Sequence, residues 1–198
     1  MVKTTTHDTE PSTDGRRTRG LNNRKQIVQA LIDLTCEGVM SPTAEQVSER
    51  AGVALRTVFR HFDDMETLYR EISAAMDQKV LETLKKPVQG DTVEARLLHA
   101  IDRRSHMFEQ LMPMQLSSLV HLHESAYLRE QQARNVEMQR FLLKLFLPEQ
   151  MVNDNTLFEA LDLCLSIETW IRLRRDQGLS VRSAKQVMRR CALQLIKP

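Results

Sequence analysis

The chain contains few of the residues that interrupt helices and few of those that favour sheets. Of its 198 residues, six are Gly, six are Pro, and aromatic residues make up 5%. Good helix formers such as Ala, Leu, Gln, Glu, Met and Arg dominate the composition. Hydrophobic residues reach 41%, enough to bury a core, which argues against global disorder. We therefore predict an all-α protein.

Cysteine and long apolar runs are also scarce. Cys36, Cys164 and Cys191 are odd in number and far apart, so we expect buried free thiols in a reducing cytoplasm. No apolar run approaches the roughly 20 residues of a membrane helix. The first twenty residues are polar, which predicts no secretory signal. We expect a cytoplasmic protein without a membrane partner.

Signatures of enzymes and metal sites are missing as well. The sequence has no Gly-rich phosphate loop, no nucleophile elbow and no paired-carboxylate signature of an acid–base enzyme. His121 and His123 are two residues apart, so on a helix they point to different faces and do not form a ligand pair. We therefore expect neither an enzyme nor a bound metal or cofactor.

Positive charge is concentrated near the N-terminus, although the net charge is only +2. Residues 16–62 carry eight basic and four acidic side chains. Such a cluster is compatible with phosphate contact, but a solvated surface explains it equally well.

Helical periodicity and capping residues divide the chain into about nine helices. Residues 1–20 are polar and lack periodicity, which predicts a flexible basic arm. Pro113 is expected to end one helix, and Gly178 to close another. The expected helices cover about residues 22–37, 44–51, 54–61, 64–86, 92–112, 114–123, 125–147, 155–177 and 180–197.

The segment 43–62 has the features of a helix-turn-helix. Gly52 can adopt the unusual backbone of a tight turn between two short helices. Small side chains at Ser48 and Ala51 allow the helices to approach closely. Apolar residues at suitable spacings would anchor the pair on the rest of the domain, namely Val47, Val53, Val58 and Phe62. The exposed side of the second helix would then offer donors and a methyl group for base edges and phosphates.

This segment resembles the DNA-binding signature of the TetR (tetracycline-repressor-like) family of transcriptional regulators. The resemblance lies in TAEQVSERAGV at residues 43–53, TVFRHF at 57–62 and ETL at 66–68. It implies an all-α homodimer in which residues 21–68 form a helix-turn-helix DNA-binding domain. Residues 69–198 would form a domain for effector binding and dimerisation, with the boundary inside the fourth helix.

The resemblance implies a set of DNA contacts, with departures. Thr43 matches a phosphate-binding position, Leu55, Arg56 and Thr57 match base-reading positions, and Phe59 and His61 match backbone contacts. Ala54 replaces a Ser of the family pattern, which predicts the loss of a capping hydroxyl. Phe59 and Met65 replace a Tyr and a Lys, which weakens the expected grip on phosphate. His61 has a second interpretation as a structural histidine. The complete predicted DNA-binding set is Arg16, Arg17, Arg19, Thr43, Ala54, Leu55, Arg56, Thr57, Phe59, Arg60 and His61.

Methionine and aromatic residues accumulate in the second half of the chain, where the family binds its effectors. Methionine suits adaptable apolar pockets, although ordinary core packing explains each residue separately. We expect an apolar or amphipathic small ligand. The predicted lining residues are Met107, Phe108, Met112, Leu116, His121, Tyr127 and Phe141.

The last two predicted helices are candidates for the dimer interface. The helix over 155–177 is apolar on more than one face, which suggests burial against both its own core and a partner. We expect a dimer-related four-helix bundle. The residues predicted at this interface are Leu161, Leu165, Trp170, Val187, Met188, Cys191 and Leu195.

Together these features predict a dimeric regulator that binds a palindromic operator in double-stranded DNA. Most simply it is a repressor that a small molecule releases from DNA. Two alternatives remain open: a helical interaction module of the same fold with weakened DNA binding, and a transcriptional activator.

Overall fold

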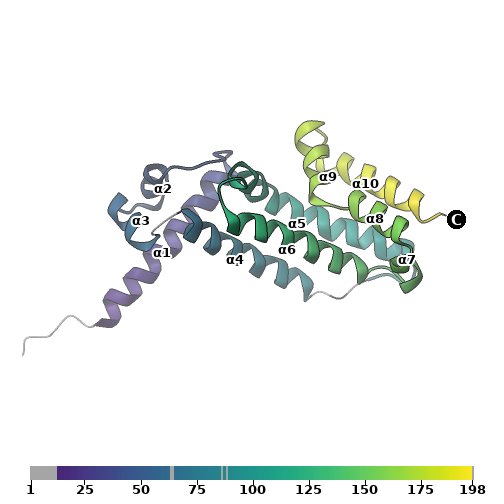
Figure 1. The fold of residues 1–198 in the computed structure, drawn as a ribbon, viewed down its shortest axis with the longest axis horizontal. Helices are drawn as coiled ribbons and strands as arrows, with labels where there is room; N and C mark the ends of the chain where they lie inside the picture. The colour runs from purple at the N-terminus through teal and green to yellow at the C-terminus, as the bar shows by residue number, and fades with distance from the viewer. Residues whose placement is uncertain (1–12, 63–64, 86, 88, 198) are drawn as a thin grey trace, which may run out of the picture. The chain divides into compact units, whose positions relative to one another are not determined.

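The computed structural model describes residues 13–62, 65–85, 87 and 89–197 and contains only helices in these ranges. The predicted all-α class is therefore confirmed. Figure 1 shows the elements in chain order. They are α1 (Thr13–Cys36), α2 (Ala44–Ala51), α3 (Leu55–His61), α4 (Met65–Leu84), α5 (Val93–His121), α6 (Ala126–Lys144), α7 (Glu149–Asn153), α8 (Asn155–Cys164), α9 (Ile167–Ile171), the π-helical turn η1 (Arg172–Asp176) and α10 (Val181–Leu195).

Contacts within the chain divide it into two compact units, and the division falls after Leu68. The boundary predicted from the sequence, between residues 68 and 69, lies at the same point inside α4. In the first unit α1 packs against both α2 and α3. The core of this unit is apolar, and its most deeply buried members are Ile27, Leu31, Val47, Val58, Phe62 and Leu68.

The N-terminal end of α1 differs from the predicted arm. Residues 13–20 belong to this helix, so only residues 1–12 of the expected arm remain, and they lie outside the described residues. Arginine is a good helix former, whereas each glycine costs about 1 kcal/mol relative to alanine, and the helix forms across Gly15 and Gly20 in spite of that cost. A Cβ at Gly20 would lie 3.9 Å from the ring of His61, which is an ordinary van der Waals contact.

In the second unit α5 packs against α6, α9 and α10 around one apolar core. The expected break at Pro113 is wrong, because α5 continues through this residue to His121. Proline removes one helical hydrogen bond. The next turn buries Met114, Gln115 and Ser117, whose burial offsets that loss and keeps the segment helical.

The segment 155–177, predicted as one helix, is divided into α8, α9 and η1. The Ser166 side chain accepts a hydrogen bond from the Thr169 backbone N–H at 3.1 Å and caps the start of α9. Serine competes with the helix for backbone hydrogen bonds, which favours a new start at this residue. The predicted start at Ser180 is confirmed, since its hydroxyl accepts from the Ser183 N–H and caps α10.

Candidate functional site

The first candidate site is the pair of short helices α2 and α3, joined by a tight turn. Thr43 and Gln46 form a capping box, with a Thr43 N–H to Gln46 Oε1 distance of 2.9 Å. Gly52 adopts a left-handed backbone with φ of 66°, and its N–H donates to the last carbonyls of α2. The guanidinium of Arg50 forms a bidentate ion pair with Glu37, the residue that follows α1, at 2.6 and 2.8 Å. These contacts hold α2 on α1 and direct the chain into α3.

The exposed face of α3 combines two cations with two apolar side chains. Arg56 and Arg60 lie one turn apart, both are exposed, and neither forms an ion pair among the described residues. Leu55 is 36% exposed and Phe59 is 56% exposed, also one turn apart. Such a surface can pair with phosphates and contact apolar parts of a ligand such as a thymine methyl group.

Two predicted members of this face are placed elsewhere. Thr57 is only 8% exposed, so its side chain is not available as a base reader in this conformation. α3 has only seven residues, and the turn that buries Val58 in the core also buries Thr57 beside it. The imidazole of His61 lies close to Gly20 of α1, and its Nε2 is buried without a partner. Burial, followed by the charges of Arg60 and Arg24, lowers the pKa of His61. Its position fits the structural interpretation.

Thr43 is exposed at the N-terminus of α2, where helix geometry favours an anion. The chain itself supplies one. The backbone N–H of Glu45 and the hydroxyl of Thr43 hydrogen bond to the Glu45 carboxylate, and they lower the pKa of that group. A phosphate that approaches Thr43 would therefore compete with this carboxylate.

Three arginines and Ala54 complete the predicted set. Arg19 is exposed on α1, and the backbones of Arg16 and Arg17 lie in the same helix, while their side chains are outside the described residues. Ala54 is exposed at the N-cap of α3 and provides no side-chain hydrogen bond. The predicted loss of a capping hydroxyl at this position is confirmed.

The second candidate site is a cavity of about 370 Å³ in the second unit. Side chains of α4, α5 and α6 line it, with Ile167 at the start of α9. Its walls are largely apolar and rich in methionine, which makes them adaptable. The methionines are Met76, Met107, Met114 and Met138.

Of the seven predicted lining residues, Met107 and Phe108 do line this cavity. Met112 and Leu116 instead pack against the apolar core. His121 interacts with Tyr69 and Glu124, and Tyr127 is buried below the guanidinium of Arg70. Phe141 is 56% exposed and does not line the cavity. These five residues do not line this cavity, because Met and aromatic content does not reveal which helix face points toward it.

Sequence reasoning also missed the polar part of this cavity. Asp77 of α4, Gln115 of α5, and Gln131, Arg134 and Gln139 of α6 contribute to its lining. Ile72, Met76 and Val80 of α4 contribute apolar side chains to the same lining. Ser73 and Asp77 lie one helical turn apart, and so do Ile72, Met76 and Val80 in succession. This spacing along one face of α4 was the available signal for the cavity lining.

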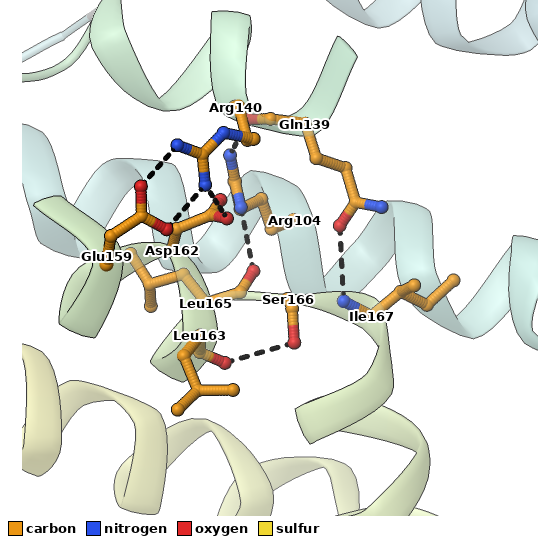
Figure 2. A network of polar contacts seen from close by, with 9 residues as sticks. All are labelled: Arg104, Gln139, Arg140, Glu159, Asp162, Leu163, Leu165, Ser166 and Ile167. Atoms are coloured by element: carbon orange, nitrogen blue, oxygen red, sulfur yellow. Dashed lines mark hydrogen bonds and ion pairs between the residues drawn. The ribbon is translucent and has the colours of Figure 1, made fainter. Parts of the chain in front are cut away.

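A buried arginine connects the cavity wall with the break between α8 and α9. Figure 2 shows Arg104 donating to the carbonyl of Leu165 at 2.7 Å and to the carbonyl of Gln139 at 2.5 Å. The side-chain oxygen of Gln139 accepts from the N–H of Ile167 at 3.2 Å. Arg104 is 4% exposed, and burial lowers its pKa to about 10, although the charge of Asp162 acts in the opposite direction.

The neighbouring surface carries an ion-pair cluster that joins α6 and α8. Arg140 forms ion pairs with Glu159 at 2.5 Å and with Asp162 at 2.9 Å, as Figure 2 also shows. Hydrogen bonds to these carboxylates raise the pKa of Arg140 and lower that of Glu159. The cluster and Arg104 together hold α5, α6 and α8 in a defined arrangement.

The predicted dimer interface is only partly available. Four of its residues are fully buried in the chain's own core, each with 0% exposure, namely Leu161, Leu165, Trp170 and Met188. These predictions are wrong, because a side chain that is already enclosed has no surface to offer to a partner. α8 and α9 are apolar on several faces, since α10 packs against α8 and α5 packs against α9.

The other three residues form an exposed stripe on α10. Val187 and Leu195 are each 39% exposed, and Cys191 between them is exposed. Leu163 on the adjacent α8 is 71% exposed. The thiols of Cys164 and Cys191 interact, and burial raises the pKa of Cys164 to about 12. Cys36 is also exposed, so the expectation of three buried thiols is wrong.

Among the described residues, no helix is long and apolar enough to cross a membrane. The same part of the chain holds no cluster of three or more His, Cys, Asp or Glu side chains that could bind a metal ion. Comparison of the chain with family models gives no match, and comparison with curated proteins gives none either.

Proposed function

We propose that this protein is a dimeric, ligand-responsive transcriptional regulator that binds DNA through α3. The observation that carries the proposal is the exposed face of α3, where Arg56 and Arg60 stand on a short helix fixed by the Gly52 turn. The sequence resemblance to the TetR family supports the same function. A repressor of a palindromic operator in the cytoplasm is the simplest form.

The two arginines have the chemistry that DNA recognition needs. Arginine can donate two hydrogen bonds to guanine in the major groove, or pair with a phosphate. Leu55 and Phe59 on the same face could contact thymine methyl groups. Because the Thr43 site is shared with Glu45 and the Thr57 side chain is buried, we assign most of the recognition to Arg56 and Arg60.

A dimer would use the stripe of Val187, Cys191 and Leu195, with Leu163 beside it. Apolar exposure on two adjacent helices is suited to a self-complementary contact around a two-fold axis. Two α3 helices would then read inverted half-sites about one helical turn apart, roughly 34–36 Å. The cavity in the second unit would hold the effector that changes this spacing.

DNase footprinting on genomic fragments, with full-length protein, tests this proposal. We expect protection of an inverted repeat, and a loss of affinity of about 5- to 150-fold for Arg56→Ala, corresponding to about 1–3 kcal/mol. The matched control is Arg172→Ala, which removes an exposed arginine of η1. Unchanged protection by Arg56→Ala would show that α3 is not the recognition helix.

One observation favours the alternative of a helical interaction module. Phe59 and Leu55 expose an apolar pair on α3, which a protein partner could also cover. Absence of protection on every genomic fragment would support that alternative. If protection is found, a transcription assay with the protected promoter distinguishes a repressor from an activator.

A further inference from the structure

The polar side chains around the cavity differ in whether the protein already satisfies them. Gln115 donates to Gln132 at 2.6 Å, and the Gln139 amide oxygen accepts from the Ile167 backbone. Asp77 of α4, in contrast, forms no hydrogen bond and no ion pair among the described residues. The cavity therefore presents one acidic group whose hydrogen-bonding capacity remains available to a ligand.

The only other charged side chain lining the cavity in the described structure is Arg134, and it is already engaged. Its guanidinium donates to Gln131 at 2.8 Å, lies 3.7 Å from Glu130, and stands over the ring of Tyr127. An anionic ligand would have to separate these partners and would also approach Asp77. A cationic ligand needs neither change.

Asp77 lies at the exposed rim, and its surroundings disfavour an isolated negative charge. Burial raises the pKa of its carboxyl group, whereas Arg134 acts to lower it. A ligand cation at this point would stabilise the ionised form. Deeper in the cavity the walls are apolar, with flexible methionines that can adapt to different shapes.

We infer that the cavity binds an amphiphilic organic cation, a molecule with an apolar body and a protonated amine that pairs with Asp77. This inference specifies the effector class of the proposed regulator and rests on that proposal for its biological role. The apolar body would lie among Met76, Met107 and Met114, and the ammonium group would donate to the carboxylate at the rim.

A matched set of eight-carbon probes separates charge from apolarity. Octylamine, octan-1-ol and octanoate are titrated into the full-length protein at pH 7 by calorimetry. We expect octylamine to bind at least about fivefold more tightly than octan-1-ol, as befits a charge-assisted hydrogen bond at a partly exposed rim, and octanoate most weakly. Equal or tighter binding of octanoate, or no binding of any probe, overturns the inference.

Variants place the interaction at the proposed atoms. Asp77→Asn is expected to remove the preference for the amine over the alcohol, while Glu137→Gln, an exposed carboxylate on α6, leaves it unchanged. Ser73→Phe, which fills the cavity, is expected to weaken all probes. An unchanged amine preference in Asp77→Asn overturns the inference even if Ser73→Phe fails to fold.

The DNA footprint is measured separately, so the two proposals can fail independently. Binding of octylamine that depends on Asp77 supports the ligand class whether or not DNA is bound. If the footprint exists but octylamine does not weaken it, the ligand class stands and ligand-controlled release from DNA is contradicted. If no footprint exists, the proposed function fails alone.

Discussion

Replacement of Arg104 by methionine tests the buried connection between α5, α6 and the break after α8. The variant keeps most of the length of the side chain and removes the guanidinium. The Leu165 carbonyl then loses its donor at 2.7 Å, and the Gln139 carbonyl loses one at 2.5 Å. Gln139 lies inside α6, so its carbonyl keeps a helical donor, whereas Leu165 lies beyond the end of α8.

The expected loss follows mainly from the carbonyl of Leu165. A buried carbonyl without a partner costs about 1–3 kcal/mol. The removal of a buried charge from Arg104 acts in the opposite direction, because burying that charge is itself unfavourable. We predict a net destabilisation of about 2 kcal/mol, equivalent to a fall in Tm of about 4–8 °C for a domain of this size.

The fluorescence of Trp170 provides the assay. It is the only tryptophan of the chain, it is fully buried, and it belongs to the same unit as Arg104. Thermal unfolding of Arg104→Met is compared with that of the exposed control Arg172→Met, which should remain within about 0.5 kcal/mol of the original protein. An Arg104→Met protein that is as stable as the original, or more stable, would refute the reasoning, since it would mean that desolvation of the charge outweighs its hydrogen bonds.

Three further predictions concern single groups. Ala54→Ser restores a side-chain cap to α3 and should stabilise that helix by up to about 1 kcal/mol, which would slow its hydrogen exchange. Unchanged or faster exchange would argue against a missing cap. The folded state lowers the pKa of His61, so the stability due to this group is present above its ordinary value and is lost as the pH falls below it. The hydrogen-exchange protection factors of α1–α3, which correct for the pH dependence of the chemical exchange step, should therefore fall between pH 7 and pH 5, and fall less in His61→Gln. Identical changes in protection in the two proteins would contradict this role. The thiol of Cys164, with a pKa of about 12, should react with maleimide at pH 8 far more slowly than exposed Cys36, as mass spectrometry of labelled peptides would show; similar rates would contradict the described burial.

Local signals in the sequence predicted the helix-turn-helix well. The capping box of Thr43 and Gln46, the left-handed turn at Gly52 and the missing cap at Ala54 depend on residues close together in the chain. Their chemistry can be read from the sequence because the partners lie within a few positions.

The features that were missed depend on contacts between distant residues. The break after α8 is supported by Arg104, which is 61 positions away from the carbonyl that it binds. The hydrophobic periodicity of residues 155–177 does not predict that contact. Likewise, the apolar character of Phe141 and Trp170 predicted a contact for each side chain. It did not predict that Phe141 is exposed, or that Trp170 is enclosed by its own chain.

Selection from a random double-stranded DNA library tests the central claim most directly. Full-length protein and its Arg56→Ala variant are each incubated with the library, and the retained fragments are sequenced. The account predicts that the original protein enriches an inverted repeat with half-sites about one helical turn apart, and that the variant loses this enrichment. Retained DNA with the same composition as the input library would contradict sequence-specific recognition by α3.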